Sequence, residues 1–235
     1  MLTIPKLPRP SDYELEYDFW PWGDLVAAVV KRVQNTFPAG EAVCDYMCGT
    51  GFLLNGIFRV RPDLRLRGCS LDEDYINYGK KKYPNIHLEI ADALVWKPST
   101  RSDAIICTAG LHHLERVRQP HFIAKVASEL VQGEMFLLGE ELIDDYGNEA
   151  ERRQAVQSLS TRLLHHLGEV RAPHPVVQAA IDVFENDYFE RGEYKTTYKK
   201  LIRMLKPSFS VESVEHFWPR DDSAIGDFLF VCRRK

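Results

Sequence analysis

A glycine turn directly follows an apolar run at residues 42–51, which read AVCDYMCGTG. The apolar segment 52–58 (FLLNGIF) comes next and can open a helix. Because glycine lacks a Cβ, such a turn lets the backbone come close to a ligand. We therefore expect a strand, a tight turn and a helix here, with a ligand held at the turn.

Strand-like and helix-like segments alternate around this unit. Strands are expected at 42–46, 64–71, 86–90, 104–109 and 134–139, and helices at 23–36, 51–60, 74–83 and 120–130. Residues 104–109 (AIICTA) are apolar on both faces, as in a central parallel strand. The alternation predicts a parallel sheet with helices on both faces.

The alternation stops after Glu140. Helices are expected at 149–168, 175–189 and 195–205 without a strand among them, and strands return at 210–217 and 228–233. We predict an α/β fold: a Rossmann-like, doubly wound, seven-stranded sheet, mostly parallel with a C-terminal antiparallel strand. A helical insertion follows the fifth strand, and inserts at strand ends shape substrate pockets.

Charge and cysteine usage narrow the possible partners. A net charge of −4 argues against sequence-independent nucleic-acid binding, which needs a basic surface. No apolar run approaches the roughly 18 residues that span a membrane, and the proline-rich start lacks a signal-peptide core. Five cysteines without paired ligand spacing read as reduced thiols. We expect a cytoplasmic protein that acts on a small molecule and binds no nucleic acid, membrane or metal, as a monomer or homodimer.

Five segments in order, at 43–51, 68–80, 90–93, 103–114 and 133–139, resemble the class I S-adenosylmethionine-dependent methyltransferases of small molecules. The resemblance spans residues 40–140 and implies S-adenosyl-L-methionine as cofactor and S-adenosyl-L-homocysteine as product. It implies that Gly49 and Gly51 approach the methionine part of the cofactor and that Asp45 helps to receive its ammonium group.

The resemblance also implies contacts beyond the glycine turn. Asp92 would accept a hydrogen bond from the adenine amine, and residues 108–111 would line the sulfonium. Tyr17 belongs to an aromatic patch that resembles arms folded over the cofactor. The expected cofactor contacts are Tyr17, Asp45, Met47, Cys48, Gly49, Gly51, Ser70, Leu71, Asp72, Asp92, Ala93, Thr108 and Leu111. The expected domains are an arm and helix covering this site (1–36), the core (37–146 and 206–235) and a helical lid (147–205).

Two residues depart from the family pattern. The family usually has glycine at Met47, whose side chain either turns away from the cofactor or narrows its slot. It usually has an acid at Ser70, and we expect Asp72 to take over the ribose contact, because it lies on the same side of an extended segment.

Candidate catalytic residues follow the fourth and fifth strands. His112 and His113 lie where the methyl group should emerge, and one of Glu140 and Glu141 can orient a histidine or accept a proton, with Glu140 taken as the candidate. Equally, the histidines can cap a turn or pack against the insertion, and Glu140 can cap a helix. Residues 192–198 (GEYKTTY) can contact a substrate, although Thr196 is more simply the cap of the last inserted helix.

The leading functional hypothesis is methylation of a small, partly apolar metabolite, with oxygen or carbon favoured as the acceptor atom. A second hypothesis keeps the cofactor but uses it for non-methylating chemistry, such as cyclisation or dehydration. A third is a non-catalytic interaction module whose cofactor slot has decayed.

Overall fold

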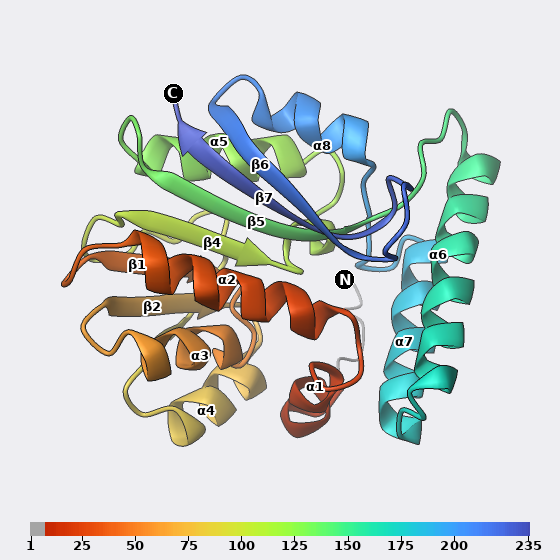
Figure 1. Cartoon of the computed structure of the whole chain (residues 1–235), viewed down its shortest axis with the longest axis horizontal. Helices are drawn as coiled ribbons and strands as arrows, with labels where there is room; N and C mark the ends of the chain where they lie inside the picture. Colours follow the sequence, from red (N-terminus) through yellow and green to blue (C-terminus); the bar gives the residue numbers. More distant parts are fainter. Residues whose placement is uncertain (1–7) are drawn as a thin grey trace.

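The central sheet has seven strands, which are spread from the bottom to the top of the view in Figure 1 of the computed structural model, which describes residues 8–235. The strand order is β3-β2-β1-β4-β5-β7-β6, and β7 alone runs in the direction opposite to the other six strands. The predicted Rossmann-like sheet is therefore confirmed. The strands are β1 (Ala42–Tyr46), β2 (Arg65–Ser70), β3 (His87–Ile90), β4 (Ala104–Thr108), β5 (Met135–Leu142), β6 (Phe209–Trp218) and β7 (Gly226–Arg234).

Helices cover both faces of the sheet (Figure 1). On one face α2 (Trp22–Thr36), α3 (Phe52–Val60) and α4 (Glu73–Lys82) bury an apolar layer against the sheet. On the other face α5 (Gln119–Glu129) and α8 (Tyr198–Leu205) do the same. Every residue of β1, β4 and β5 is buried, because both faces of these central strands are covered.

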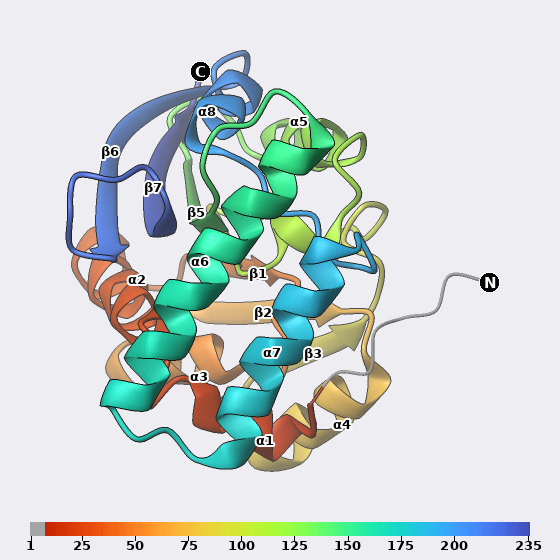
Figure 2. The same ribbon diagram turned by 90° about the vertical axis from the view of Figure 1, so that its right-hand side faces the viewer.

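Two long helices stand across the carboxyl ends of the parallel strands (Figure 2). They are α6 (Glu149–Glu169) and α7 (His174–Tyr188), which pack on each other around an apolar cluster of their own. The short helix α1 (Pro10–Glu16) lies near the foot of α7 and contacts α4 as well. Within residues 8–235, no helix is both long enough and apolar enough to cross a lipid bilayer.

Most predicted boundaries lie within three residues of the observed ones, and three details differ. The prolines of residues 1–10 predict an extended arm, but Pro10 opens α1, since proline suits the first turn of a helix. The rest of that arm, residues 1–7, lies outside the described residues. The helix expected from 195 begins at Tyr198, and its cap is Thr197, whose side chain accepts from Lys200 N, rather than Thr196.

Candidate active site

The glycine turn after β1 needs small residues because other groups crowd it. Gly49 and Gly51 have positive φ angles of 54° and 81°. A Cβ on Gly49 would lie 3.0 Å from the hydroxyl of Tyr13 in α1. Gly51 caps the start of α3, so the turn and the helix are one continuous unit, as the sequence predicts.

Asp45 at the end of β1 is the strongest candidate for a cofactor contact. The residue is 1% exposed, and its Oδ1 has no hydrogen-bond partner within residues 8–235. Burial raises the pKa of this carboxyl well above its usual value. A buried carboxyl without a donor fits a ligand that brings a positive charge, such as the ammonium group of S-adenosylmethionine.

Met47 adopts a backbone conformation that favours glycine, with a φ of 61°. Its side chain packs against Gly110, which follows β4. Met47 therefore fills space at the same strand ends that should line the sulfonium. The Cys48 side chain next to Met47 points toward β2 instead, where a Cβ on Gly68 would lie 2.7 Å from the Cys48 sulfur.

The ends of β2 and β3 present the residues expected around the adenosine. The side chain of Asp72 caps α4 by accepting from Tyr75 N at 2.8 Å, and Ser70 Oγ accepts from Asp72 N at 3.3 Å. Leu71 between them is 69% exposed, so its side chain is free to pack against the adenine ring of a bound nucleotide. After β3, Asp92 accepts from Leu94 N at 2.8 Å, and Ala93 is buried.

Helix α1 covers the glycine turn from outside. Its Tyr13 and Tyr17 share a hydrogen bond of 2.9 Å between their hydroxyls, and Tyr17 stacks on Phe52 at the start of α3. Glu14, which sequence reasoning missed, accepts from Thr50 in the turn and from Tyr83 after α4. These contacts fix α1 to the core, although its sequence carries no apolar period that would have predicted this.

Glu140 at the end of β5 holds the segment after β4 in place. Its Oε1 accepts from Gly110 N at 3.2 Å and from Leu111 N at 2.8 Å. Its Oε2 lies 2.7 Å from His112 Nδ1. Burial would lower the pKa of His112, but the charge and hydrogen bond of Glu140 outweigh it and raise the pKa. The predicted pairing of Glu140 with a histidine is therefore present.

A second acid that the sequence analysis did not select faces both histidines. Glu193 Oε2 lies 3.6 Å from His112 Nε2, and Glu193 Oε1 lies 3.1 Å from His113 Nδ1. Burial would raise the pKa of Glu193, but the charges of His113 and His112 outweigh burial and hold its pKa at about 2. The only sequence signal for Glu193 is its place beside a glycine in the segment 192–198, which is 80 residues from the histidines in the chain.

Lys195 is the buried cation next to Glu193 and Glu141. It is fully buried, with its Nζ 3.3 Å from Glu141 Oε2 and 3.8 Å from Glu193 Oε2. Burial would lower the pKa of Lys195, but the charges of Glu141, Asp187 and Glu193 outweigh it, so the pKa is raised. Asp227 of β7 pairs in register with Glu141 and is also buried.

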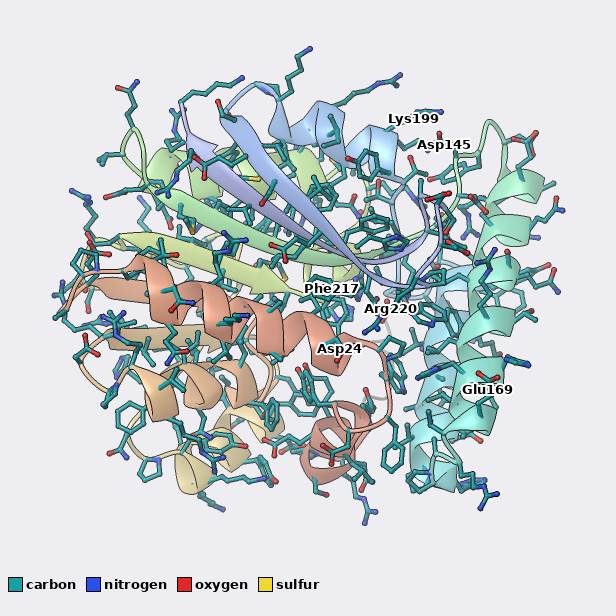
Figure 3. The ribbon with its side chains drawn as sticks, in the orientation of Figure 1. Asp24, Asp145, Glu169, Lys199, Phe217 and Arg220 are labelled. Carbon is teal, nitrogen blue, oxygen red and sulfur yellow. The ribbon has the colours of Figure 1, made fainter. Side chains whose placement is uncertain are left out.

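A cleft of about 580 Å³ lies between the α1–α2 connection, α6 and the β6–β7 turn. Tyr17, Trp20, Phe217 and Trp218 give it an aromatic lining. Figure 3 shows Phe217, Arg220 and Asp24 at this side of the molecule, where Arg220 and Asp24 form an ion pair of 3.0 Å. Tyr17 is thus shared between the cleft and the cover of the glycine turn.

Several solved methyltransferases and a cyclopropane synthase share this fold. Magnesium protoporphyrin IX methyltransferase from Synechocystis PCC 6803, with S-adenosylhomocysteine bound, is 16% identical with a TM-score of 0.62, over 92% of this chain and 84% of that one. A mycolic acid cyclopropane synthase is 11% identical with a TM-score of 0.64, over 88% and 84%. These likenesses define the fold as that of the class I S-adenosylmethionine-dependent methyltransferases.

Sequence comparison agrees with the fold. Residues 43–133 match the family described as a methyltransferase domain. The chain is also 28% identical over 124 residues to the carboxy-S-adenosyl-L-methionine synthase of Campylobacter fetus subsp. fetus (strain 82-40). That match covers 51% of this chain, which spans about half (53%) of the curated relative. Residues 43–133 are thus similar to a methyltransferase domain, and the chain has the fold of the class I methyltransferases.

Proposed function

We propose that this protein transfers a methyl group from S-adenosylmethionine to an oxygen or carbon atom of a small, partly apolar metabolite. The observation that carries the proposal is the buried carboxyl of Asp45 at the end of β1, next to the glycine turn, whose Oδ1 has no hydrogen-bond partner in the part of the chain that the structure describes. The neighbouring strand β4 leads to His112 at the same edge of the sheet. One edge therefore offers both a place for a cationic cofactor and a place to remove a proton.

The bound cofactor supplies an electrophilic methyl group, and the chain has to align the acceptor with it. A hydroxyl or an activated carbon must also lose a proton before or during the transfer. The cluster of His112, His113 and Glu193 is the place where we expect that proton to leave. The backbone N–H groups of Gly110 and Leu111 hold the Glu140 carboxylate in place, and its Oε2 in turn orients the His112 ring.

The aromatic cleft beside Tyr17 supports a partly apolar acceptor. Aromatic side chains contribute large contact areas to the binding of flat or apolar molecules. The hairpin of α6 and α7 closes the other side of the strand ends, which favours an acceptor of limited size over a macromolecule.

The name of the curated relative favours a second candidate function, in which the protein modifies S-adenosylmethionine itself to carboxy-S-adenosylmethionine. The departures at Met47 and Ser70 fit either function, since both alter the cofactor slot rather than the acceptor side. The two candidates differ in what becomes of the cofactor.

Calorimetry with S-adenosylmethionine and S-adenosylhomocysteine, followed by mass spectrometry, tests both candidates. We expect both nucleotides to bind and S-adenosylhomocysteine to accumulate with one member of a metabolite panel. A heavier, carboxylated nucleotide would instead support the second candidate. Absence of binding at millimolar nucleotide would leave only a non-catalytic module.

A further inference from the structure

Two imidazoles and one carboxylate meet at the carboxyl edge of β4. One ligand atom from each of His112, His113 and Glu193 lies within 4.8 Å of the other two. The histidines belong to the short helix η1 (Leu111–His113), and Glu193 belongs to the extended segment after α7. Two histidines with one carboxylate form a ligand set that suits Zn²⁺, Mn²⁺ or Fe²⁺ and leaves further coordination positions open.

Glu140 orients His112 as metal-ligating histidines are oriented in proteins. The Glu140 carboxylate already accepts two backbone N–H groups through Oε1, so its Oε2 accepts from Nδ1 of His112 at 2.7 Å. In the neutral ring that donates from Nδ1, the lone pair is on Nε2, and this atom lies 3.6 Å from Glu193 Oε2. A carboxylate behind a histidine fixes its tautomer and raises its basicity toward a metal.

The buried side of the cluster has an acceptor without a donor. Glu193 is 3% exposed, yet its Oε2 has no hydrogen-bond partner among the described residues. An unpaired buried oxygen of this kind is costly and calls for a positive group. Lys195 is the nearest candidate, but its Nζ lies 3.8 Å from this oxygen and closer to Glu141.

The formal charges also leave room for a divalent cation. The one ammonium group of Lys195 faces two buried carboxyl groups, those of Glu141 and Glu193. The cluster is reachable, because the side chain of His113 is 44% exposed while that of His112 is 9% exposed. An ion can therefore enter from the His113 side.

We propose that His112, His113 and Glu193 bind one divalent transition-metal ion, and that this ion binds the oxygen of a hydroxyl acceptor. The proposal rests on the proposed function and narrows its acceptor from oxygen or carbon to a metal-binding hydroxyl. A hydroxyl bound to the ion loses its proton to water at neutral pH. Its oxygen then forms the new bond to the methyl carbon, and the C–S bond breaks with the electron pair staying on sulfur.

Cobalt titration of the chelator-treated full chain tests the site without any turnover. We expect one Co²⁺ per chain and a visible absorption band typical of histidine ligation, displaced by Zn²⁺. His113→Ala and Glu193→Gln should weaken Co²⁺ binding at least tenfold, and Glu140→Gln by about 10–100-fold as an outer partner. His165→Ala is the matched control, because that histidine is exposed on α6, and it should bind as the wild type does.

His113→Ala is the decisive variant, since its side chain is partly exposed and its removal leaves the core intact. Equal Co²⁺ affinity in wild type, His113→Ala and Glu193→Gln would overturn the site, as would a lack of any Co²⁺ band. If S-adenosylmethionine still binds in that case, the proposed function stands without the metal. Co²⁺ binding without nucleotide binding would instead support the metal site and contradict the proposed function.

Discussion

The side chain of Met47 lies against Gly110: a Cβ on Gly110 would come within 2.9 Å of the Met47 Cβ and 3.2 Å of its Cε. This contact joins the turn after β1 to the segment after β4, at the point where a sulfonium should lie. From this contact we expect that Met47 narrows the cofactor slot, which is one of the two alternatives that the sequence leaves open.

Replacing Met47 by glycine should therefore tighten cofactor binding. Met47→Gly removes the side chain that packs against Gly110, at the strand ends that should line the sulfonium. It also relieves a positive φ, which changes the stability of the free and the bound protein alike. We expect S-adenosylmethionine to bind up to about tenfold more tightly by calorimetry, since tenfold corresponds to about 1.4 kcal/mol. Met204→Ala, in α8, is the control and should not change the affinity. Weaker binding by Met47→Gly would show that the thioether supports the nucleotide.

Asp45→Asn should weaken binding of S-adenosylmethionine by about 10–100-fold, because a hydrogen bond to a charged group contributes about 1.5–3 kcal/mol. The loss should be specific to the amino-acid part of the nucleotide. 5′-Methylthioadenosine lacks that part, so wild type and variant should bind it equally in the same calorimeter. A matching loss for both nucleotides would mean that Asp45 acts through the shape of the turn and not through its charge.

The ribose contact can be separated from helix capping at Asp72. Asp72→Asn keeps an oxygen that can accept from Tyr75 N, so it should leave the melting temperature nearly unchanged. It should still weaken S-adenosylmethionine binding by about tenfold, through loss of the charged acceptor. Ser70→Ala should weaken binding less. The reverse order of the two affinities would place the ribose at Ser70.

Glu16 should make stability fall with rising pH. Burial, helped by the charge of Asp12, raises its pKa from 4.5 to about 8, and its Oε1 lacks a hydrogen-bond partner within residues 8–235. The folded protein thus keeps a proton that the unfolded chain loses, and the stabilisation present below pH 4.5 is lost as the pH rises through about 8.

Thermal unfolding from pH 4 to pH 9 checks this sign. Glu16→Gln should match the wild type at the acidic end and become the more stable protein above about pH 8, since it cannot ionise. Asp18→Asn, at an exposed neighbour, serves as the control and should follow the wild type. A stability difference between Glu16→Gln and wild type that does not change with pH would contradict the assignment.

The sequence predicts the sheet well, because its central strands carry a pattern that depends on local residues alone. The apolar run 104–109 and the glycine turn at 49–51 mark β4 and the end of β1 without reference to the rest of the chain. Helix α1 was missed, since its contacts come through the polar side chain of Glu14 and not through an apolar period.

The acceptor side of the site is less predictable for a different reason. His112 and Glu140 could be paired in advance, because neighbouring parallel strands end at the same edge. Glu193 and Lys195 could not, since nothing in residues 143–192 fixes where the chain returns to the sheet. Their positions depend on the packing of α6 on α7, which is a property of the folded hairpin.

The extended segment 193–197 is tied to the sheet at two places. Tyr194 N donates to His112 O at 2.7 Å, and Ile143 N donates to Thr196 O at 3.1 Å. The orientation of the imidazoles therefore depends on the segment 193–197 and not on the hairpin of α6 and α7. Exchange of residues 149–188 alone should alter which acceptors fit, whereas an exchange that extends through 197 should also change which atom of the acceptor reacts. We therefore expect residues 149–188 to set the shape of the acceptor pocket and residues 193–197 to set which atom of the acceptor reacts.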